Sequence, residues 1–203
     1  TFSPVHETSE LCGGCHELKS RTGVPLLETY SEWKQSRFAR SGDQCQTCHM
    51  ARGPAVPPSE DGQRVVPPDH SIPARRSAER LRGLLTMSLQ PLVRGHDLIA
   101  GVSVTSAKAG HSVPTGITNR RIVMTLRVMD DKGTPLGQQQ RVYQKTLVDG
   151  QGEVLTDLTS QLLRADRVAK DNRISAGETR SEEFQFAFPR RSGALIVTGV
   201  LTY

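Results

Sequence analysis

The chain carries Cys12-Gly13-Gly14-Cys15-His16, and the same pattern returns at Cys45-Gln46-Thr47-Cys48-His49. These two stretches contain all four cysteines of the 203 residues. Cys-x-x-Cys-His is the pattern that attaches haem c, since two thiols add to the vinyl groups of one porphyrin and the adjacent histidine becomes an axial ligand of its iron. The repeated pattern predicts two covalently attached haem c groups, with His16 and His49 as the proximal ligands.

Four cysteines in two pairs have other uses, which stay open at this point. The pairs could hold zinc through four thiolates, act as redox dithiols or form disulfides. A zinc site does not require a histidine directly after both pairs, whereas haem attachment does. We therefore favour haem over zinc, and zinc over disulfides.

The apolar composition around the cysteines supports a large cofactor. Residues 1–77 contain 23 residues of the hydrophobic set, and four of these are the cysteines. The remaining nineteen cannot cover a core of their own, and such segments depend on disulfides, a metal or a cofactor. Residues 51–77 hold six prolines, which predict a loop that wraps the haem segment.

Two irons with one proximal histidine each need further ligands. The remaining histidines are His6, His70, His96 and His111. Among them, His111 lies in Gly110-His111-Ser112-Val113-Pro114-Thr115-Gly116, where glycine and proline shape a tight loop, and His70 lies in a stiff, proline-rich stretch. We predict both as distal ligands, together with His6, which could serve the second haem or a haem of a neighbouring molecule. His96 is interpreted as a surface residue, and a methionine such as Met50 is an alternative at one site.

Helices are predicted near the cysteines. Thr29-Tyr30-Ser31-Glu32 is typical of a capping box that opens a helix running to about Arg40. A second, short helix is expected from Ser77 to Leu89, because leucines recur there at helical spacing and a proline follows.

From about Leu98 the apolar period changes from helical spacing to alternation. Apolar and polar residues alternate around Val102, through Ile122–Val128 and through Phe184–Phe188, with glycine-rich turns between them. This pattern predicts an antiparallel β-sandwich of about seven strands, similar to an immunoglobulin or fibronectin type III domain, over residues 98–203. Residues 1–97 are predicted to form a loop-rich, partly helical dihaem segment, so the expected fold class is mixed.

Charge and hydropathy exclude several classes of protein. The net charge is +5, but the basic residues are scattered and do not form the stripe expected of a nucleic-acid-binding protein. No apolar run approaches the roughly 18 residues that a membrane span needs. The chain begins at Thr1 without a basic-then-apolar leader, so we interpret it as either processed or trimmed. Covalent haem attachment and the four thiols favour an exported protein whose signal peptide has been removed.

These residues together resemble the multihaem cytochrome c proteins of the cytochrome c554-like kind. The matching stretches are Cys12-Gly13-Gly14-Cys15-His16-Glu17, Glu32-Trp33, Ser36-Arg37-Phe38-Ala39, Cys45-Gln46-Thr47-Cys48-His49-Met50, and Gly110-His111-Ser112-Val113-Pro114-Thr115-Gly116 with Arg120 or Arg121 after it. The resemblance covers residues 9–50 closely and 98–203 loosely. It implies electron transfer outside the cytoplasm through bis-histidine haems packed close together. Related proteins often carry four or more haems, so a two-haem chain resembles one module, subunit or filament unit of a longer electron path.

The leading hypothesis is therefore an electron carrier of the periplasm or cell exterior. Its expected partners are redox proteins, either acidic proteins or other multihaem cytochromes, and self-assembly is a further expectation. The alternative is a haem enzyme with one open iron, a peroxidase or a reductase of small nitrogen or sulfur compounds, although no catalytic acid–base group can be identified. A third hypothesis makes the β-rich half an interaction module that docks the haem pair on a larger assembly.

Overall fold

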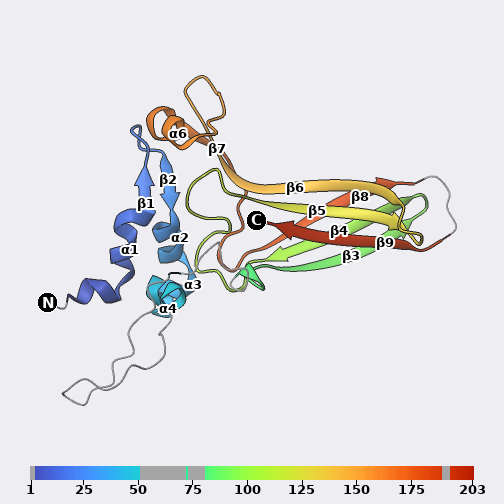
Figure 1. Cartoon of the computed structure of the whole chain (residues 1–203), viewed down its shortest axis with the longest axis horizontal. Coiled ribbons are helices and arrows are strands. Elements are labelled where there is room, and N and C mark those ends of the chain that lie inside the picture. The colour runs from blue at the N-terminus through green and yellow to red at the C-terminus, as the bar shows by residue number, and fades with distance from the viewer. Residues whose placement is uncertain (1–2, 51–71, 73–80, 189–192) are drawn as a thin grey trace, which may run out of the picture.

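The computed structural model describes residues 3–50, 72, 81–188 and 193–203. Of the described residues, 44% are in strands and 21% in helices. An N-terminal segment of short helices lies at one end of a long body made of two facing sheets (Figure 1).

The N-terminal segment carries both cysteine motifs on short helices. Its elements in chain order are the 3-10 helix η1 (Pro4–Glu7), α1 (Ser9–His16), β1 (Glu17–Lys19), β2 (Pro25–Glu28), α2 (Thr29–Gln35), α3 (Arg37–Arg40) and α4 (Cys45–His49). Strands β1 and β2 form an antiparallel hairpin between the first two helices. Each motif therefore occupies a helix of its own, with its histidine as the last helical residue.

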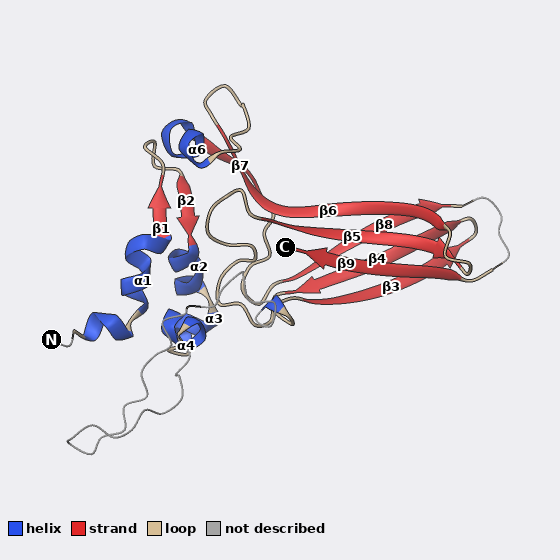
Figure 2. Cartoon of the chain, in the orientation of Figure 1, coloured by secondary structure: helices blue, strands red, loops and turns tan. Residues whose placement is uncertain are grey.

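The body consists of two antiparallel sheets. One has the order β3 (Thr86–Arg94), β4 (Asp97–Thr105), β8 (Thr179–Ala187), and the other has the order β7 (Arg167–Asp171), β6 (Pro135–Val148), β5 (Arg121–Asp130), β9 (Leu195–Thr202). Helix α6 (Leu158–Arg164) lies between β6 and β7 in sequence and beside the β1–β2 hairpin in space (Figure 2).

Side chains that alternate along the strands fill the space between the two sheets. In β4 every second residue is buried, as expected for a strand with one face in a core. The inner residues of β5, including Met124 and Leu126, are fully buried against Phe184 of the facing sheet. This cluster is the main core of the protein.

The N-terminal segment has very little core of its own. Among its described residues, Val24 and Leu26 are the buried apolar side chains, and both pack on a second cluster with Leu147, Leu155 and Ala165 of the body. The hairpin is therefore anchored to the body rather than to the helices that carry the cysteines.

The predicted fold class is wrong. We expected a loop-rich, partly helical segment followed by a seven-stranded, immunoglobulin-like sandwich. The described residues instead form three antiparallel sheets without a closed barrel, and their five α-helices are all short. The segment before residue 98 contributes strands to two of these sheets, which the sequence analysis did not predict.

The helix expected from Ser77 to Leu89 is wrong over Thr86–Leu89, although Leu81 is helical and is followed by a turn. Thr86–Leu89 belong to β3, and residues 77–80 lie outside the described part of the chain, as does nearly all of the proline-rich stretch 51–77. The leucine spacing fits a helix, but Met87 and Leu89 also alternate, and pairing with β4 packs both against the core. The division at residues 97 and 98 stays a proposal, and β3 and β4 pair along their length on either side of it. Within the described ranges, no helix is long and apolar enough to cross a membrane.

Candidate functional site

Each cysteine motif forms one turn of helix that presents two thiols together. Residues three apart lie on the same face of a helix, so Cys12 and Cys15 are neighbours on α1, as are Cys45 and Cys48 on α4. The first cysteine of each pair is partly buried and the second is exposed. No disulfide joins the four. Each helix therefore offers a pair of accessible thiols beside a histidine.

The two motif helices are joined at their N-terminal ends. The Ser9 amide donates to Gln44 Oε1 at 2.8 Å, and the Cys45 amide donates to Ser9 Oγ at 2.9 Å. Ser9 is fully buried by this contact. Burial raises the pKa of the Cys12 thiol, and the neighbouring Cys45 thiol raises it further. The first cysteine of one motif therefore lies close to the first cysteine of the other.

The histidine of the second motif faces a histidine from the body. The ring centroids of His49 and His111 are 6.2 Å apart, and the two ring planes differ by 16°. A ligating imidazole nitrogen lies about 2 Å from its metal and about 1 Å from its own ring centre, so two imidazoles on opposite sides of one metal have centroids about 6 Å apart. The observed separation of 6.2 Å matches this value.

The hydrogen bonding of His111 favours the same use. Its Nδ1 lies 3.0 Å from the carbonyl oxygen of Ser112, which is a bond that an Nδ1–H donates. This bond selects the tautomer whose Nε2 carries the lone pair, which is the nitrogen that can ligate a metal. His111 thus presents a ligand nitrogen held by a backbone carbonyl.

The loop that carries His111 is fixed from both sides. On the body side, Val113 and Ile174 exchange two backbone hydrogen bonds of 2.8 and 3.0 Å. On the helical side, Glu32 Oε2 accepts from the Ser112 amide at 3.1 Å and from Thr115 Oγ1 at 2.7 Å. His111 is therefore presented to α4 by contacts from two distant parts of the chain.

Aromatic side chains of the N-terminal segment fill the space under the loop. A Cβ on Gly110 would lie 3.6 Å from the Trp33 ring and 3.7 Å from the Phe38 ring, so the loop backbone passes directly over both. A Cβ on Gly13 would lie 2.8 Å from the Tyr30 ring. Tyr30 and Trp33 are themselves 5.6 Å apart, and this pair extends from the first motif to the His111 loop.

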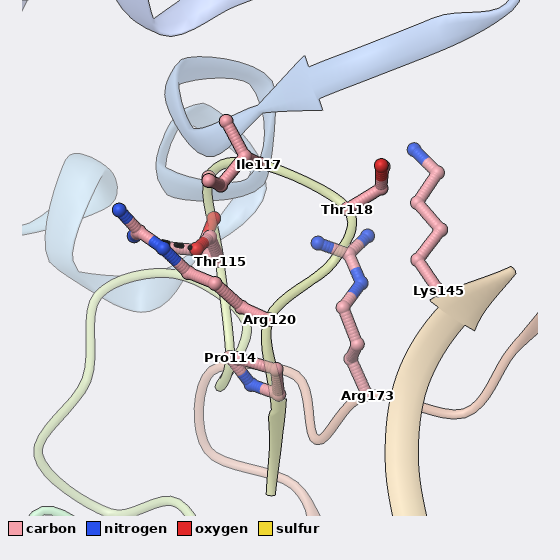
Figure 3. Close-up of a pocket in the computed structure, with 8 residues that line it drawn as sticks. Pro114, Thr115, Ile117, Thr118, Arg120, Lys145 and Arg173 are labelled. Carbon is pink, nitrogen blue, oxygen red and sulfur yellow. Dashed lines mark hydrogen bonds between the residues drawn. The ribbon is translucent and has the colours of Figure 1, made fainter. Parts of the chain in front are cut away.

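Two buried cations, Arg173 and Lys145, lie beside the loop (Figure 3). Arg173 has an exposed side-chain fraction of only 8% and contacts three carboxylates, those of Glu28, Glu32 and Asp171. Lys145, buried still more fully, pairs with Glu28 as well. Burial by itself lowers the pKa of Arg173, but the hydrogen bonds that Arg173 donates to Asp171 and the charges of Glu32 and Asp171 outweigh it and raise that pKa. Arg173 is therefore a permanent cation in the joint between the two halves.

The structure brings only some of the predicted site residues together. His16 ends α1 and is exposed, and His6 in η1 is exposed with Nδ1 at 3.0 Å from the Ser3 carbonyl. The Gln46 side chain of α4 donates to the His6 carbonyl at 3.0 Å, so His6 lies beside the second motif. His70 lies outside the described residues. His96 is exposed in the β3–β4 turn, away from the motif helices.

Two residues of this site were not identified from the sequence. Glu32 was interpreted as the closing residue of a capping box, but the cap of α2 is Glu28, and the Glu32 carboxylate binds the His111 loop instead. Arg173 belongs to no motif in the sequence. A long-range ion pair leaves no local pattern, although a glutamate next to Trp33 between the two motifs was a signal in the resemblance.

The comparisons with known proteins identify a fold and no family. No family model matches the chain, and no curated protein matches it. Its fold is similar to that of a solved structure, a penta-heme cytochrome c552 from Thermochromatium tepidum, with a TM-score of 0.69 and 24% sequence identity. The match covers 89% of this chain and 45% of that one, so this chain spans less than half the length of the cytochrome that it resembles.

Among the described residues, no three His, Cys, Asp or Glu side chains form a group that could hold a metal ion. The described residues do contain two thiol pairs, one on α1 and one on α4, and the neighbouring histidines His49 and His111. They are the groups that would hold a c-type haem: two thiols for covalent attachment and imidazole nitrogens to ligate its iron.

Proposed function

We propose that this protein transfers electrons through two covalently bound c-type haems. The observation that carries the proposal is the placement of His111 opposite His49, the histidine of a Cys-x-x-Cys-His helix, at the spacing of two axial ligands. Two such helices side by side, and a fold shared with a penta-heme cytochrome c552, support it.

The residues divide between the two haems as follows. Cys45 and Cys48 attach one haem, which His49 and His111 ligate. Cys12 and Cys15 attach the other, with His16 as its proximal ligand and His6 or His70 as the candidate on the opposite side. When bound, the haems supply the one-electron chemistry.

The chain's own residues set the spacing and surroundings of that chemistry. The Ser9–Gln44–Cys45 hydrogen bonds hold the two attachment helices together, so the attachment points at Cys12 and Cys45 are neighbours. A short distance between centres is what fast transfer from one to the next requires. Trp33 and Phe38 pack directly against the backbone of the His111 loop at Gly110.

The proposed chemistry also indicates a cellular location and a class of partner for this protein. Covalent haem attachment favours the periplasm or the cell exterior, and we propose a c554-like module or subunit, or a filament unit, of a longer electron path. The net charge of +5 would favour acidic redox partners and raise their association rate at low salt. Other multihaem cytochromes, or further copies of this chain, are the second class of partner.

The test is the absorption spectrum of the reduced haem-loaded protein, before and after addition of carbon monoxide. We expect low-spin c-type bands that the gas leaves unchanged in the wild type, because both irons carry two protein ligands. In His111→Ala about half of the haem should bind carbon monoxide, whereas His96→Ala, which removes an exposed histidine far from the motifs, should match the wild type.

Other outcomes would contradict the proposal in different ways. Carbon monoxide binding by about half of the wild-type haem would mean one open iron and would favour a haem enzyme. An unchanged spectrum in His111→Ala would overturn the ligand assignment, and absence of haem would return the cysteines to zinc.

A further inference from the structure

Glu32 joins the cysteine-bearing segment to the loop of the proposed distal ligand by hydrogen bonds. Its side chain has an exposed fraction of 12% and makes three contacts. Oε2 accepts from the Ser112 amide and from Thr115 Oγ1, and Oε1 accepts from Arg173 Nη1 at 2.6 Å. Both oxygens are therefore used, one on the His111 loop and one on the body.

Arg173 connects the same carboxylate to the other attachment of the loop. The next residue, Ile174, exchanges two backbone hydrogen bonds with Val113. The preceding residue, Asn172, is itself held by β6, because its side chain donates to the Val142 carbonyl at 2.7 Å and accepts from the Gln144 amide at 3.0 Å. Three consecutive residues thus join β6, Glu32 and the loop of His111.

From this geometry we propose that Glu32 is a positioning residue. It holds His111 over the haem of the second motif and, through its negative charge, lowers the reduction potential of that haem. The inference rests on the proposed function, since it needs His111 to be an axial ligand. A buried negative charge near the iron stabilises the oxidised state, which carries one more positive charge than the reduced state. Arg173, as the buried cation of the same pair, must act in the opposite direction.

The opposite signs make the inference testable by redox titration of the haem-loaded protein. The haem that binds carbon monoxide in His111→Ala is the haem of the second motif, and its midpoint potential is the one to follow. Glu32→Gln keeps the length of the side chain and an oxygen for the Ser112 amide but loses the charge, so we expect a higher midpoint. Arg173→Gln should lower the same midpoint, and Glu183→Gln, which removes an exposed charge from the body, should leave it unchanged.

Glu32→Ala separates positioning from charge. With no oxygen left to hold Ser112 and Thr115, we expect part of the second haem to bind carbon monoxide, while Glu32→Gln stays closed to the gas. Thermal unfolding of each variant shows whether it is folded at the temperature of the titration.

Three results would overturn the inference. Midpoint shifts of the same sign in Glu32→Gln and Arg173→Gln would mean that both changes only loosen the structure. No shift in either variant, or a Glu32→Ala protein as closed to carbon monoxide as the wild type, would mean that Glu32 neither tunes nor positions. If His111→Ala binds no more carbon monoxide than the wild type, His111 is not an iron ligand. In that case the proposed function fails, and not only the role of Glu32.

Discussion

The two halves of this molecule are held together by different means. The facing sheets of the body enclose a continuous cluster of buried apolar residues that stretches over β4, β5 and β8. Helices α2, α3 and α4 have no buried residue, and α1 has only Ser9. A segment of this kind lacks the apolar burial that stabilises a folded chain by itself. The contrast indicates that the body folds from its own sequence, whereas the cysteine-bearing segment depends on what is attached to it.

The strongest test of this contrast removes the attachment. In a chain with all four cysteines replaced by alanine, we expect no bound haem, and amide hydrogen exchange in α1, α2 and α4 close to that of an unfolded chain. Strand β5 should keep its protection, and the β1–β2 hairpin should keep part of its own, because Leu26 is buried against the body. Equal protection of α2 and β5 would mean that the segment is stable without a cofactor.

A substitution in the body core should lower the stability of the body and leave the haem spectrum unchanged. Leu126 is fully buried between the sheets, so Leu126→Ala should lower the free energy of unfolding of the body by about 2–5 kcal/mol. The haem spectrum should stay unchanged as long as the body is folded, because no contact of Leu126 reaches the motif helices. Chemical denaturation followed by both circular dichroism and haem absorbance measures this. An altered spectrum before unfolding would show that the halves are coupled through the core.

Two adjacent glycines of the first motif test how tightly the N-terminal segment, which has few buried apolar residues, is packed. A Cβ on Gly13 would lie 2.8 Å from the Tyr30 ring, whereas a Cβ on Gly14 has nothing within 4 Å. Gly13→Ala should therefore destabilise the haem-loaded protein by about 1–3 kcal/mol through overpacking. Gly14→Ala should stabilise α1 by about 0.5–1 kcal/mol, because glycine is unfavourable inside a helix. Thermal melts of the pair check both, and equal effects would show that Tyr30 does not pack on this helix.

The smallest expected effect is a loss of stability in acid at the joint between the halves. Burial alone would raise the pKa of Asp171, but the hydrogen bond and charge of Arg173 outweigh it and leave that pKa below its ordinary value. A carboxyl whose pKa is lower in the folded protein stabilises it above the unfolded pKa of about 3.9, and this contribution disappears as the pH falls through the lower folded value.

Melting temperatures between pH 6 and pH 3 should therefore fall less steeply in Asp171→Asn than in the wild type. The variant should also be slightly less stable at pH 6, where the wild-type carboxylate is charged. Parallel curves for the two proteins would show that this contact contributes nothing to the pH dependence.

Local patterns in the sequence predicted local features well. The alternation from Ile122 to Val128 predicts a strand, and β5 occupies that stretch with its inner residues buried. The shortage of apolar residues before residue 77 agrees with the absence of buried apolar side chains in the motif helices. The thiol pairs and their histidines follow from the motif alone; the structure places them on α1 and α4, and their use as haem ligands stays a prediction.

The sequence patterns did not predict contacts between residues that are far apart in the chain. The fold class was wrong because the β1–β2 and β3–β4 hairpins pack on residues far along the chain: Leu26 packs with Leu147, and Met87 and Leu89 pack on the main core. A short stretch such as Pro25–Glu28 also has no period of its own. Glu32 fitted a local capping pattern, yet its partners are Ser112, Thr115 and Arg173. No spacing in the sequence distinguishes a glutamate that caps its own helix from one that reaches across the molecule.

The His111 loop is held by Glu32 on one side and by Ile174 on the other, so its contacts form in a fixed order as the chain is synthesised. The cysteines at Cys45 and Cys48 are synthesised well before the loop, and the loop's partner Ile174 comes later still. Under the proposed function, covalent attachment at α4 can therefore precede folding of the sheets, whereas the contact between Val113 and Ile174 forms only after β7 and residue 174 have been made. A later part of the chain thus completes the surroundings of an early one, and a chain that stops before Ile174 would lack one of the two contacts that hold the His111 loop.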